Sequence, residues 1–220
     1  MWFWLLKWVL LGPVVRWYAR PRVHGRHHVP VTGPVIVAAN HQAEIDSLVL
    51  ALVLPRPPRF LAKAEYYAGG RSGLRGRFDR WLCTVTHQIP VDRGGGTAAS
   101  DSLAAAERLL REGGVWAIYP EGTRSPDGRL YRGHTGVVRV ARAVPGAVVL
   151  PVGLVGAAAV DPPYRRGWRR GRVTVSVGAP VDVSAAVGDV RAATDLLMAQ
   201  IGALSGQQPL AHYPPRRQAA

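Results

Sequence analysis

Short apolar runs alternate along this chain with longer stretches in which apolar side chains recur at helical spacing. The short runs predict buried strands at residues 35–39, 59–62, 88–91, 115–119, 148–154 and 172–177. The longer stretches predict helices at residues 47–54, 100–112, 137–143 and 189–204. Because strands and helices alternate, the pattern predicts an α/β layered fold.

An apolar segment opens the chain. Residues 1–15 are apolar except for Lys7, and Gly12-Pro13 interrupts the run. A helix that spans a bilayer needs about 20 apolar residues, so this run is too short to span without tilting or thinning the bilayer. A cleavable signal peptide has its basic residues before the apolar run, whereas here the arginines follow it. That order favours a cytoplasmic location for the rest of the chain.

Tryptophan is concentrated in the same region. Four of the seven tryptophans lie there, namely Trp2, Trp4, Trp8 and Trp17. Indole rings favour the boundary between lipid headgroups and acyl chains. We therefore predict a helix that lies in the membrane interface, with the arginines that follow it drawn to anionic headgroups. The alternative is an ordinary core helix, although core helices do not usually concentrate tryptophan in this way.

The length of 220 residues suits one domain with short appendages. We expect the membrane-interface helix at residues 1–22, the sheet-forming domain at 23–206 and a loose tail at 207–220. Apolar residues make up 48% and charged residues 19%, a balance that argues against a disordered chain. The single cysteine, Cys83, excludes an internal disulfide framework and a metal cluster of several cysteines.

The chain is strongly basic. It holds 28 Lys and Arg against 14 Asp and Glu, a net charge of +14. Such an excess predicts a polyanionic partner, namely nucleic acid, an anionic membrane surface or a phosphorylated substrate. Lys7 and Lys63 are the only lysines, and a codon habit shared with the many Ala, Gly, Val and Pro residues can account for part of the arginine count. Charge alone therefore does not choose among these partners.

Polar side chains cluster directly after three of the predicted strands, at residues 40–46, 92–93 and 121–125. The carboxyl ends of parallel strands form the crevice where α/β proteins bind ligands. We therefore expect these clusters to converge on one site.

His41 and Asp46 form a candidate catalytic pair. A carboxylate five positions after a histidine can fold back across the turn into a helix and accept the proton of one ring nitrogen. The other nitrogen is then free to act as a base, as in the base-and-orienter half of a triad. No serine or cysteine nucleophile is evident at a matching place, so a substrate hydroxyl deprotonated by His41 would itself attack an activated acyl carbonyl. The alternative is a structural histidine beside a helix-capping aspartate.

Arg93 and Arg124 each follow a predicted strand and are candidate phosphate ligands. A guanidinium fork matches the geometry of a phosphate monoester and keeps its charge at any working pH. The backbone N–H groups of Gly122 and Thr123 would add an anion-binding concavity if a turn or helix begins there. The alternative is two ordinary surface arginines.

Glu121 and Lys63 complete the candidate set. Glu121 stands close to Arg124 in sequence, so it could orient the guanidinium or bind an acceptor hydroxyl, and a salt bridge at the rim is the alternative. Lys63 follows a predicted strand and could contact an anionic substrate, or be an ordinary surface lysine. Glu44, inside the first cluster, would raise the pKa of His41 if it lay close to the ring.

Taken in order, these motifs resemble those of the glycerolipid acyltransferases, specifically the 1-acyl-sn-glycerol-3-phosphate (lysophosphatidate) acyltransferases. The hallmark of that family is Asn-His, four residues, then Asp, which matches Asn40, His41 and Asp46. The other matching blocks are Ile-Pro-Val-Asp-Arg at 89–93, Tyr-Pro-Glu-Gly-Thr-Arg-Ser at 119–125 and Val-Leu-Pro-Val-Gly at 149–153. One departure is His87, where the relatives usually carry glycine.

The resemblance implies a mixed, largely parallel central sheet wrapped by helices, with an apolar N-terminal helix on the membrane. It implies that His41 is the general base and Asp46 its orienter. The residues that it implies for holding the acceptor's glycerol phosphate are Arg93, Glu121, Gly122, Thr123 and Arg124. The donor would be an acyl thioester of coenzyme A or acyl carrier protein, with no metal and no other cofactor. The product would be phosphatidate, made at the cytoplasmic face of the cell membrane.

Three alternatives stay open. The same chemistry would serve another acceptor, such as glycerol 3-phosphate, a different lysophospholipid or a glycolipid. A nucleic-acid-binding protein is a second alternative, because basic and aromatic residues interleave at 164–172, although that segment suits lipid headgroups equally. A membrane-binding module without catalysis is the third.

Overall fold

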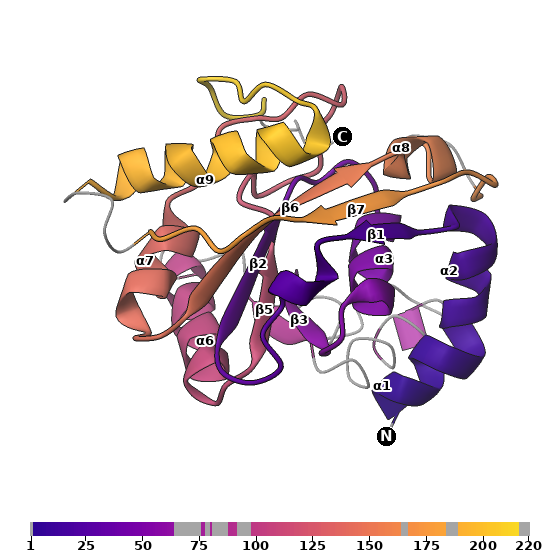
Figure 1. Cartoon of the computed structure of the whole chain (residues 1–220), viewed down its shortest axis with the longest axis horizontal. Helices are drawn as coiled ribbons and strands as arrows, with labels where there is room; N and C mark the ends of the chain where they lie inside the picture. Colours follow the sequence, from indigo (N-terminus) through magenta and orange to yellow (C-terminus); the bar gives the residue numbers. More distant parts are fainter. Residues whose placement is uncertain are drawn as a thin grey trace.

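The computed structural model describes residues 2–63, 76–77, 80, 88–91, 98–163, 167–183 and 189–215. Its centre is a seven-stranded sheet in the order β1-β7-β6-β2-β5-β3-β4 (Figure 1). In chain order the strands are β1 (Arg22–His24), β2 (Val35–Ala39), β3 (Pro58–Lys63), β4 (Ile89–Val91), β5 (Val115–Ile118), β6 (Val148–Val155) and β7 (Thr174–Val177).

Neighbouring strands run parallel except for β6 and β7, which pair antiparallel. The prediction of a mixed, largely parallel α/β sheet is therefore confirmed. Strand β2 lies between β5 and β6, and all five of its residues are buried. A strand that is covered on both faces needs an unbroken apolar run, which is the pattern that predicted residues 35–39.

Helices cover both faces of the sheet (Figure 1). The helices on one face are α2 (Leu11–Ala19), α3 (Ile45–Val53) and α8 (Ala157–Val160), and those on the other are α6 (Ala98–Arg111), α7 (Gly136–Ala143) and α9 (Val190–Ser205). Side chains of β2 alternate between the two layers. Val37 packs into the first layer and Ile36 into the second. Two apolar cores therefore hold the sheet between them.

The N-terminal helix runs through the Gly12-Pro13 pair that the sequence marks as an interruption. It comprises α1 (Trp2–Leu5), a π-helical turn η1 (Leu6–Leu10) and α2. A Cβ on Gly12 would lie 1.6 Å from the carbonyl oxygen of Lys7, so only glycine fits where the backbone passes this close. The chain thus accommodates Pro13 in a helix whose preceding turn is widened.

One side of the N-terminal helix packs on the sheet layer and the other faces outward. Gly12, Val15 and Ala19 are buried, and Val15 and Ala19 belong to the core. No helix among the described residues is long and apolar enough to cross a bilayer. The helix ends at Ala19, and the predicted domain boundary at residue 22 falls inside strand β1, so the N-terminal segment and the sheet share one fold.

The start of the C-terminal tail is bound to the body of the protein, so the prediction of a loose tail is wrong for this part. Leu130 and Pro209 form a parallel β-bridge, and the backbone N–H of Leu210 donates to the carbonyl of Leu130 at 2.8 Å. The N–H of Arg132 donates to the carbonyl of His212 at 3.1 Å. Polar residues that lack a regular pattern gave no sign of these long-range bonds.

Candidate active site

The parallel strands β2, β3, β4 and β5 all end at the same edge of the sheet, which brings the predicted polar clusters together there. His41 follows β2 by two residues and Glu121 follows β5 by three. Lys63 is the last residue of β3, and its side chain lies outside the described part of the chain. Arg93 follows β4 and also lies outside the described residues, as do Cys83 and His87.

His41 and Asp46 meet as their spacing predicts. Nδ1 of His41 lies 2.9 Å from Oδ2 of Asp46, which is fully buried in the first turn of α3. The same oxygen accepts the backbone N–H groups of Gln42 at 2.7 Å and Ala43 at 2.9 Å. The two N–H groups at the start of the helix thus hold the carboxylate, and the carboxylate in turn holds the imidazole. Because an ionised carboxylate only accepts, Nδ1 carries the proton and Nε2 presents its lone pair.

Tyr119 fixes the plane of the His41 ring. The two rings stack with centroids 3.8 Å apart and an interplanar angle of 9°, and Phe60 lies on Tyr119 with centroids 5.9 Å apart. The Tyr119 hydroxyl shares a hydrogen bond of 2.9 Å with Ser47 on α3. Burial raises the pKa of Tyr119 well above its ordinary value, so the phenol stays neutral. Sequence analysis assigned no role to this tyrosine, although it opens the 119–125 block.

Glu121 accepts a hydrogen bond from the backbone of the loop that carries His41. Its Oε1 accepts the backbone N–H of His41 at 3.0 Å and its Oε2 accepts the backbone N–H of Tyr131 at 2.9 Å. The side chain is buried, and this burial raises its pKa to about 7. A second bond joins the same two loops, because the N–H of Ser125 donates to the carbonyl of His41 at 2.8 Å. Both oxygens thus hold backbone N–H groups, and among the described residues Glu121 forms no salt bridge at the rim. The contact with a ligand that the resemblance implies stays a prediction.

The titration of Glu121 predicts a pH-dependent stability. The carboxyl has a pKa of about 7 in the folded protein against an ordinary value of 4.5. Between these values the folded state keeps a proton that the unfolded state has lost, so the free energy of unfolding falls as pH rises through this window. The difference between wild type and Glu121→Gln should change by up to about 3 kcal/mol across it. Urea unfolding at both ends of the window measures this difference, and a constant difference contradicts the prediction.

Arg124 lies at the exposed side of the same loops. Its Nη1 donates to Oε1 of Glu44 at 3.0 Å, so Glu44 and not Glu121 orients the guanidinium. The Glu44 carboxylate is three-quarters exposed and bonds to Arg124. The sequence had left open whether Glu44 lies beside the His41 ring. Exposed pairs of this kind are weak, so an incoming anion can take the place of Glu44.

A turn precedes Arg124. Gly122 has a φ of +75°, a conformation that favours glycine, and its N–H donates to the carbonyl of Tyr119 at 3.0 Å. This N–H is therefore committed to the turn, and the expectation that it faces an anion is wrong. Thr123 follows the turn and is half-buried beside Arg124.

Asn40 fastens the end of β2 to β6. Its side-chain amide donates to the carbonyl of Leu154 at 2.9 Å and accepts the N–H of Leu154 at 2.7 Å. A buried side-chain amide here replaces the backbone rung that is lost where β2 ends. The residue directly before His41 is thereby fixed to the centre of the sheet. Sequence analysis recognised Asn40 only as part of a motif.

The fold and the site together define an α/β protein in which a histidine, a buried carboxylate that orients its ring and an arginine lie beside the same loops. Comparison with known proteins identifies the family. The Acyltransferase family model matches residues 20–155, which is more than half of the chain. The chain therefore belongs to this family.

Two named relatives match part of the chain. The chain is 33% identical over 126 residues to 1-acyl-sn-glycerol-3-phosphate acyltransferase alpha of Mus musculus, covering 57% of this chain and 42% of that protein. It is 29% identical over 166 residues to the chloroplastic 1-acyl-sn-glycerol-3-phosphate acyltransferase LPAT1 of Arabidopsis thaliana, covering 74% and 44%. These matches span less than half the length of either relative.

A solved structure shares the fold. The crystal structure of PlsC, the 1-acyl-sn-glycerophosphate acyltransferase from Thermotoga maritima, superimposes with a TM-score of 0.65 at 21% sequence identity. The match covers 90% of this chain and 79% of that one. The similarity therefore extends over nearly all of the chain, including parts outside the matched family model.

Proposed function

We propose that the protein transfers a fatty acyl group from an acyl thioester to the sn-2 hydroxyl of 1-acyl-sn-glycerol 3-phosphate, which yields phosphatidate. The observation that carries the proposal is the His41–Asp46 pair, held at 2.9 Å and stacked on Tyr119 in a chain of the Acyltransferase family. The names of the matched relatives support this acceptor.

His41 acts as the general base in this proposal. Nε2 takes the proton of the acceptor hydroxyl as its oxygen attacks the thioester carbonyl, and Asp46 stabilises the imidazolium that forms. The tetrahedral intermediate collapses with loss of the thiolate, which takes its proton from the imidazolium. Each cycle thus returns Nε2 to its starting state. Much of the rate gain comes from holding hydroxyl and thioester together at this ring.

Arg124 holds the phosphate of the acceptor in this proposal. The guanidinium exchanges the exposed Glu44 carboxylate for a phosphate, which carries more charge and accepts a bidentate contact. By resemblance we add Arg93 and Thr123 as further contacts at the same edge of the sheet, and we add Lys63 because it ends strand β3 there. Glu121 takes a different part, because it positions the loop that carries His41.

Arg124→Ala should raise the KM for lysophosphatidate at least tenfold while kcat changes little, because a charge-assisted contact to a phosphate contributes about 1.5–3 kcal/mol. Steady-state kinetics with the acceptor varied measure this. The matched control is Arg139→Ala, an exposed arginine on α7. An unchanged KM in the Arg124 variant contradicts its phosphate role.

The acceptor and the donor are tested by competition. We expect lysophosphatidate to outcompete glycerol 3-phosphate, a lysophosphatidylcholine and a glycolipid when equal concentrations are offered with one acyl donor. Preference for one of the others assigns the same chemistry to that acceptor. The parallel assay with acyl-coenzyme A and acyl carrier protein, each with one defined chain, identifies the donor.

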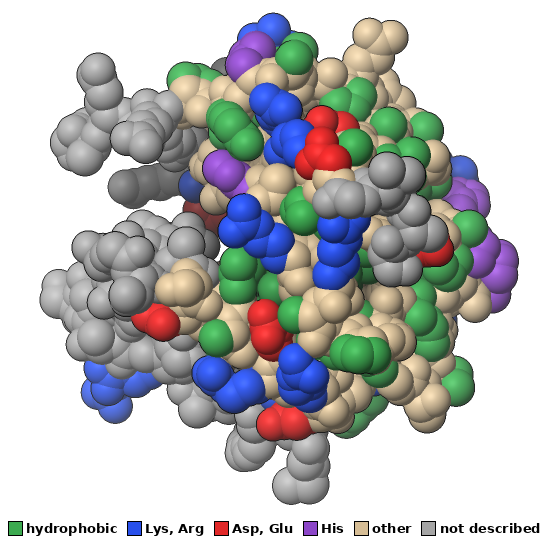
Figure 2. All heavy atoms as spheres, turned by 90° about the vertical axis from the view of Figure 1, so that its left-hand side faces the viewer, with side chains coloured by type: hydrophobic (Ala, Val, Ile, Leu, Met, Phe, Trp, Pro, Cys, Tyr) green, Lys and Arg blue, Asp and Glu red, His purple; other side chains and the backbone are tan. Residues whose placement is uncertain are grey.

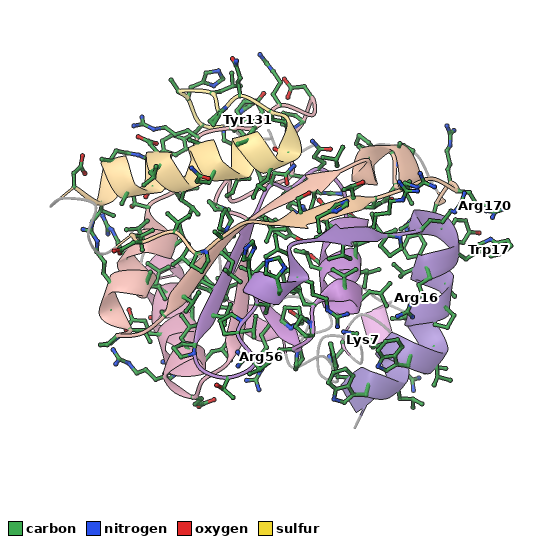
Figure 3. All side chains as sticks on the ribbon, viewed as in Figure 1. Lys7, Arg16, Trp17, Arg56, Tyr131 and Arg170 are labelled. Carbon is green, nitrogen blue, oxygen red and sulfur yellow. The ribbon has the colours of Figure 1, made fainter. Side chains whose placement is uncertain are left out.

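We propose further that the outward face of the N-terminal helix lies in the interface of an anionic membrane, on the cytoplasmic side. Trp8, Val9 and Trp17 are each more than half exposed, which leaves a large apolar surface in contact with water. Arg170 lies over the Trp17 ring at 4.2 Å, and both side chains point away from the body of the protein (Figure 3). Paired indole and guanidinium groups suit the headgroup region.

Replacing both Trp8 and Trp17 by serine should lower binding to vesicles that contain phosphatidylglycerol at least tenfold, because two large apolar side chains no longer enter the interface. Cosedimentation measures the bound fraction. The control is Leu196→Ser, an exposed apolar residue on α9. If the double variant binds as wild type does, the helix is not the membrane contact.

Nucleic-acid binding is the competing function. On the face that Figure 2 shows, acidic side chains stand between the basic ones, whereas grip on a phosphate backbone uses a continuous basic track. The first part of the basic segment at 164–172 lies outside the described residues. Binding to duplex DNA that survives His41→Ala, with no acyl transfer by wild type, would favour this alternative.

A further inference from the structure

Residues 207–213, which we call the C-terminal strap, lie against the loop that carries the site. The strap follows α9 and folds back over the top of the molecule in Figure 1. Its backbone bonds to Leu130 and Arg132 fix it to the segment after the 119–125 block. The His134 and Tyr213 rings stack with centroids 4.6 Å apart, which adds an apolar contact at the far end. The strap is therefore attached to residues 130–134 by backbone bonds and one ring contact.

Gln207 begins the strap and bonds in two directions. Its Oε1 accepts from Nδ2 of Asn40 at 2.9 Å, and its Nε2 donates to the carbonyl of Gly128 at 2.5 Å. Asn40 directly precedes His41, and its other amide bonds reach Leu154 on β6. One side chain thus connects the residue before the base to the far side of the site loop.

A second connection reaches His41 through Glu121. The strap bonds to the residues on either side of Tyr131, namely Leu130 and Arg132. The N–H of Tyr131 donates to Glu121, whose other oxygen accepts the N–H of His41. The backbone of His41 is therefore held between two routes that both begin in the strap.

We propose that Gln207 is a positioning residue for the catalytic histidine, and that the strap sets the location of the His41 ring. Asp46 and Tyr119 fix the orientation of the ring, and Asp46 also holds the backbone that follows His41, whereas the backbone before His41 is held through Asn40. General-base catalysis depends on a hydrogen-bond reach of about 3 Å, so a small shift of this backbone separates the base from the hydroxyl. Gln207 adds a bond from the strap to Asn40, beside the two that Asn40 makes with Leu154. The inference rests on the proposed acyl transfer for its kinetic consequence alone.

The kinetic test compares Gln207→Ala with Gln208→Ala, a neighbouring glutamine that is exposed. We expect Gln207→Ala to lower kcat at least tenfold with the KM for lysophosphatidate unchanged and the thermal midpoint preserved. Gln207→Glu keeps an acceptor for Asn40 but places a carboxylate against the Gly128 carbonyl, so its kcat should lie between those of wild type and Gln207→Ala. Gln208→Ala should match wild type. A kcat for Gln207→Ala within twofold of wild type, or a loss that follows the unfolded fraction, overturns the proposal.

A readout that needs no turnover separates this inference from the proposed function. In protein labelled with ¹⁵N at histidine, the Nδ1–H signal of His41, assigned by its loss in His41→Ala, reports the bond to Asp46. We expect this signal to shift or broaden in Gln207→Ala and to keep its wild-type position in Gln208→Ala. An identical signal in wild type and Gln207→Ala contradicts a positioning role. If wild type forms no phosphatidate, the proposed function fails, but the comparison of the His41 signals still tests whether Gln207 positions the ring.

Discussion

Replacing His41 by alanine is expected to lower kcat by about 10³-fold, within the range that general-base catalysis contributes. The variant removes the nitrogen that we propose takes the acceptor's proton, while Asp46 keeps its two backbone N–H donors and stays in place. The loss should therefore fall on kcat and leave the fold unchanged. Initial rates of phosphatidate formation at saturating acceptor measure the effect.

The control for this variant is His24→Ala, an exposed histidine on strand β1. Its kcat should equal that of wild type. The thermal midpoint and vesicle binding of the His41 variant should also match wild type, since we assign membrane contact to the exposed side chains of the N-terminal helix. A His41 variant that keeps more than a tenth of the wild-type kcat would show that another group removes the proton.

Replacing Asp46 by asparagine should lower kcat by about 10²–10⁴-fold, as expected when a base loses the carboxylate that selects its tautomer. The change keeps the size of the side chain but removes the charge beside Nδ1. The proton then favours Nε2 in part of the population, and the imidazolium formed in the reaction loses its stabilising partner.

The same helix start offers a matched control. Oδ2 of Asp161 accepts the backbone N–H of Ile45 at 3.0 Å, next to Asp46, without a contact to His41 in the described structure. Asp161→Asn tests the loss of an acidic group at this helix terminus by itself. If it lowers kcat as much as Asp46→Asn does, the effect of Asp46 is structural and the orienting role is wrong.

Local pattern predicted most of the fold. The run at 35–39 is strand β2 to the residue, and the helices predicted at 100–112 and 189–204 lie within two residues of α6 and α9. These elements bury an unbroken apolar run or one helical face, so their pattern is present in the sequence itself. Parallel pairing followed from the alternation of strands and helices.

Elements held by distant partners escaped prediction. Strand β1 is only three residues long, with two exposed residues, and exists because β7 pairs with it. The strap contains Pro209 and no regular apolar pattern, and its order comes from bonds to Leu130 and Arg132. Neither has an apolar period of its own, so their partners became visible only in three dimensions.

The candidate site likewise contains one contact that the sequence predicted and several that it did not. The spacing of His41 and Asp46 encodes their contact, because both lie on one turn into α3. The support of the loop could not be predicted, since Tyr119 and Glu121 come from β5 and its following loop, some 80 residues away in sequence. The closeness of Glu121 to Arg124 in sequence and the family resemblance predicted a ligand contact, but neither indicates that the side chain is buried and accepts two backbone N–H groups.

The most direct measurement combines purified protein, lysophosphatidate and one acyl thioester, and quantifies phosphatidate by mass spectrometry alongside the free thiol released. The account predicts one phosphatidate for each thiol, with both products absent when His41 is replaced. Thiol and free fatty acid without phosphatidate would show that water and not the lipid hydroxyl attacks the thioester, and would contradict the account.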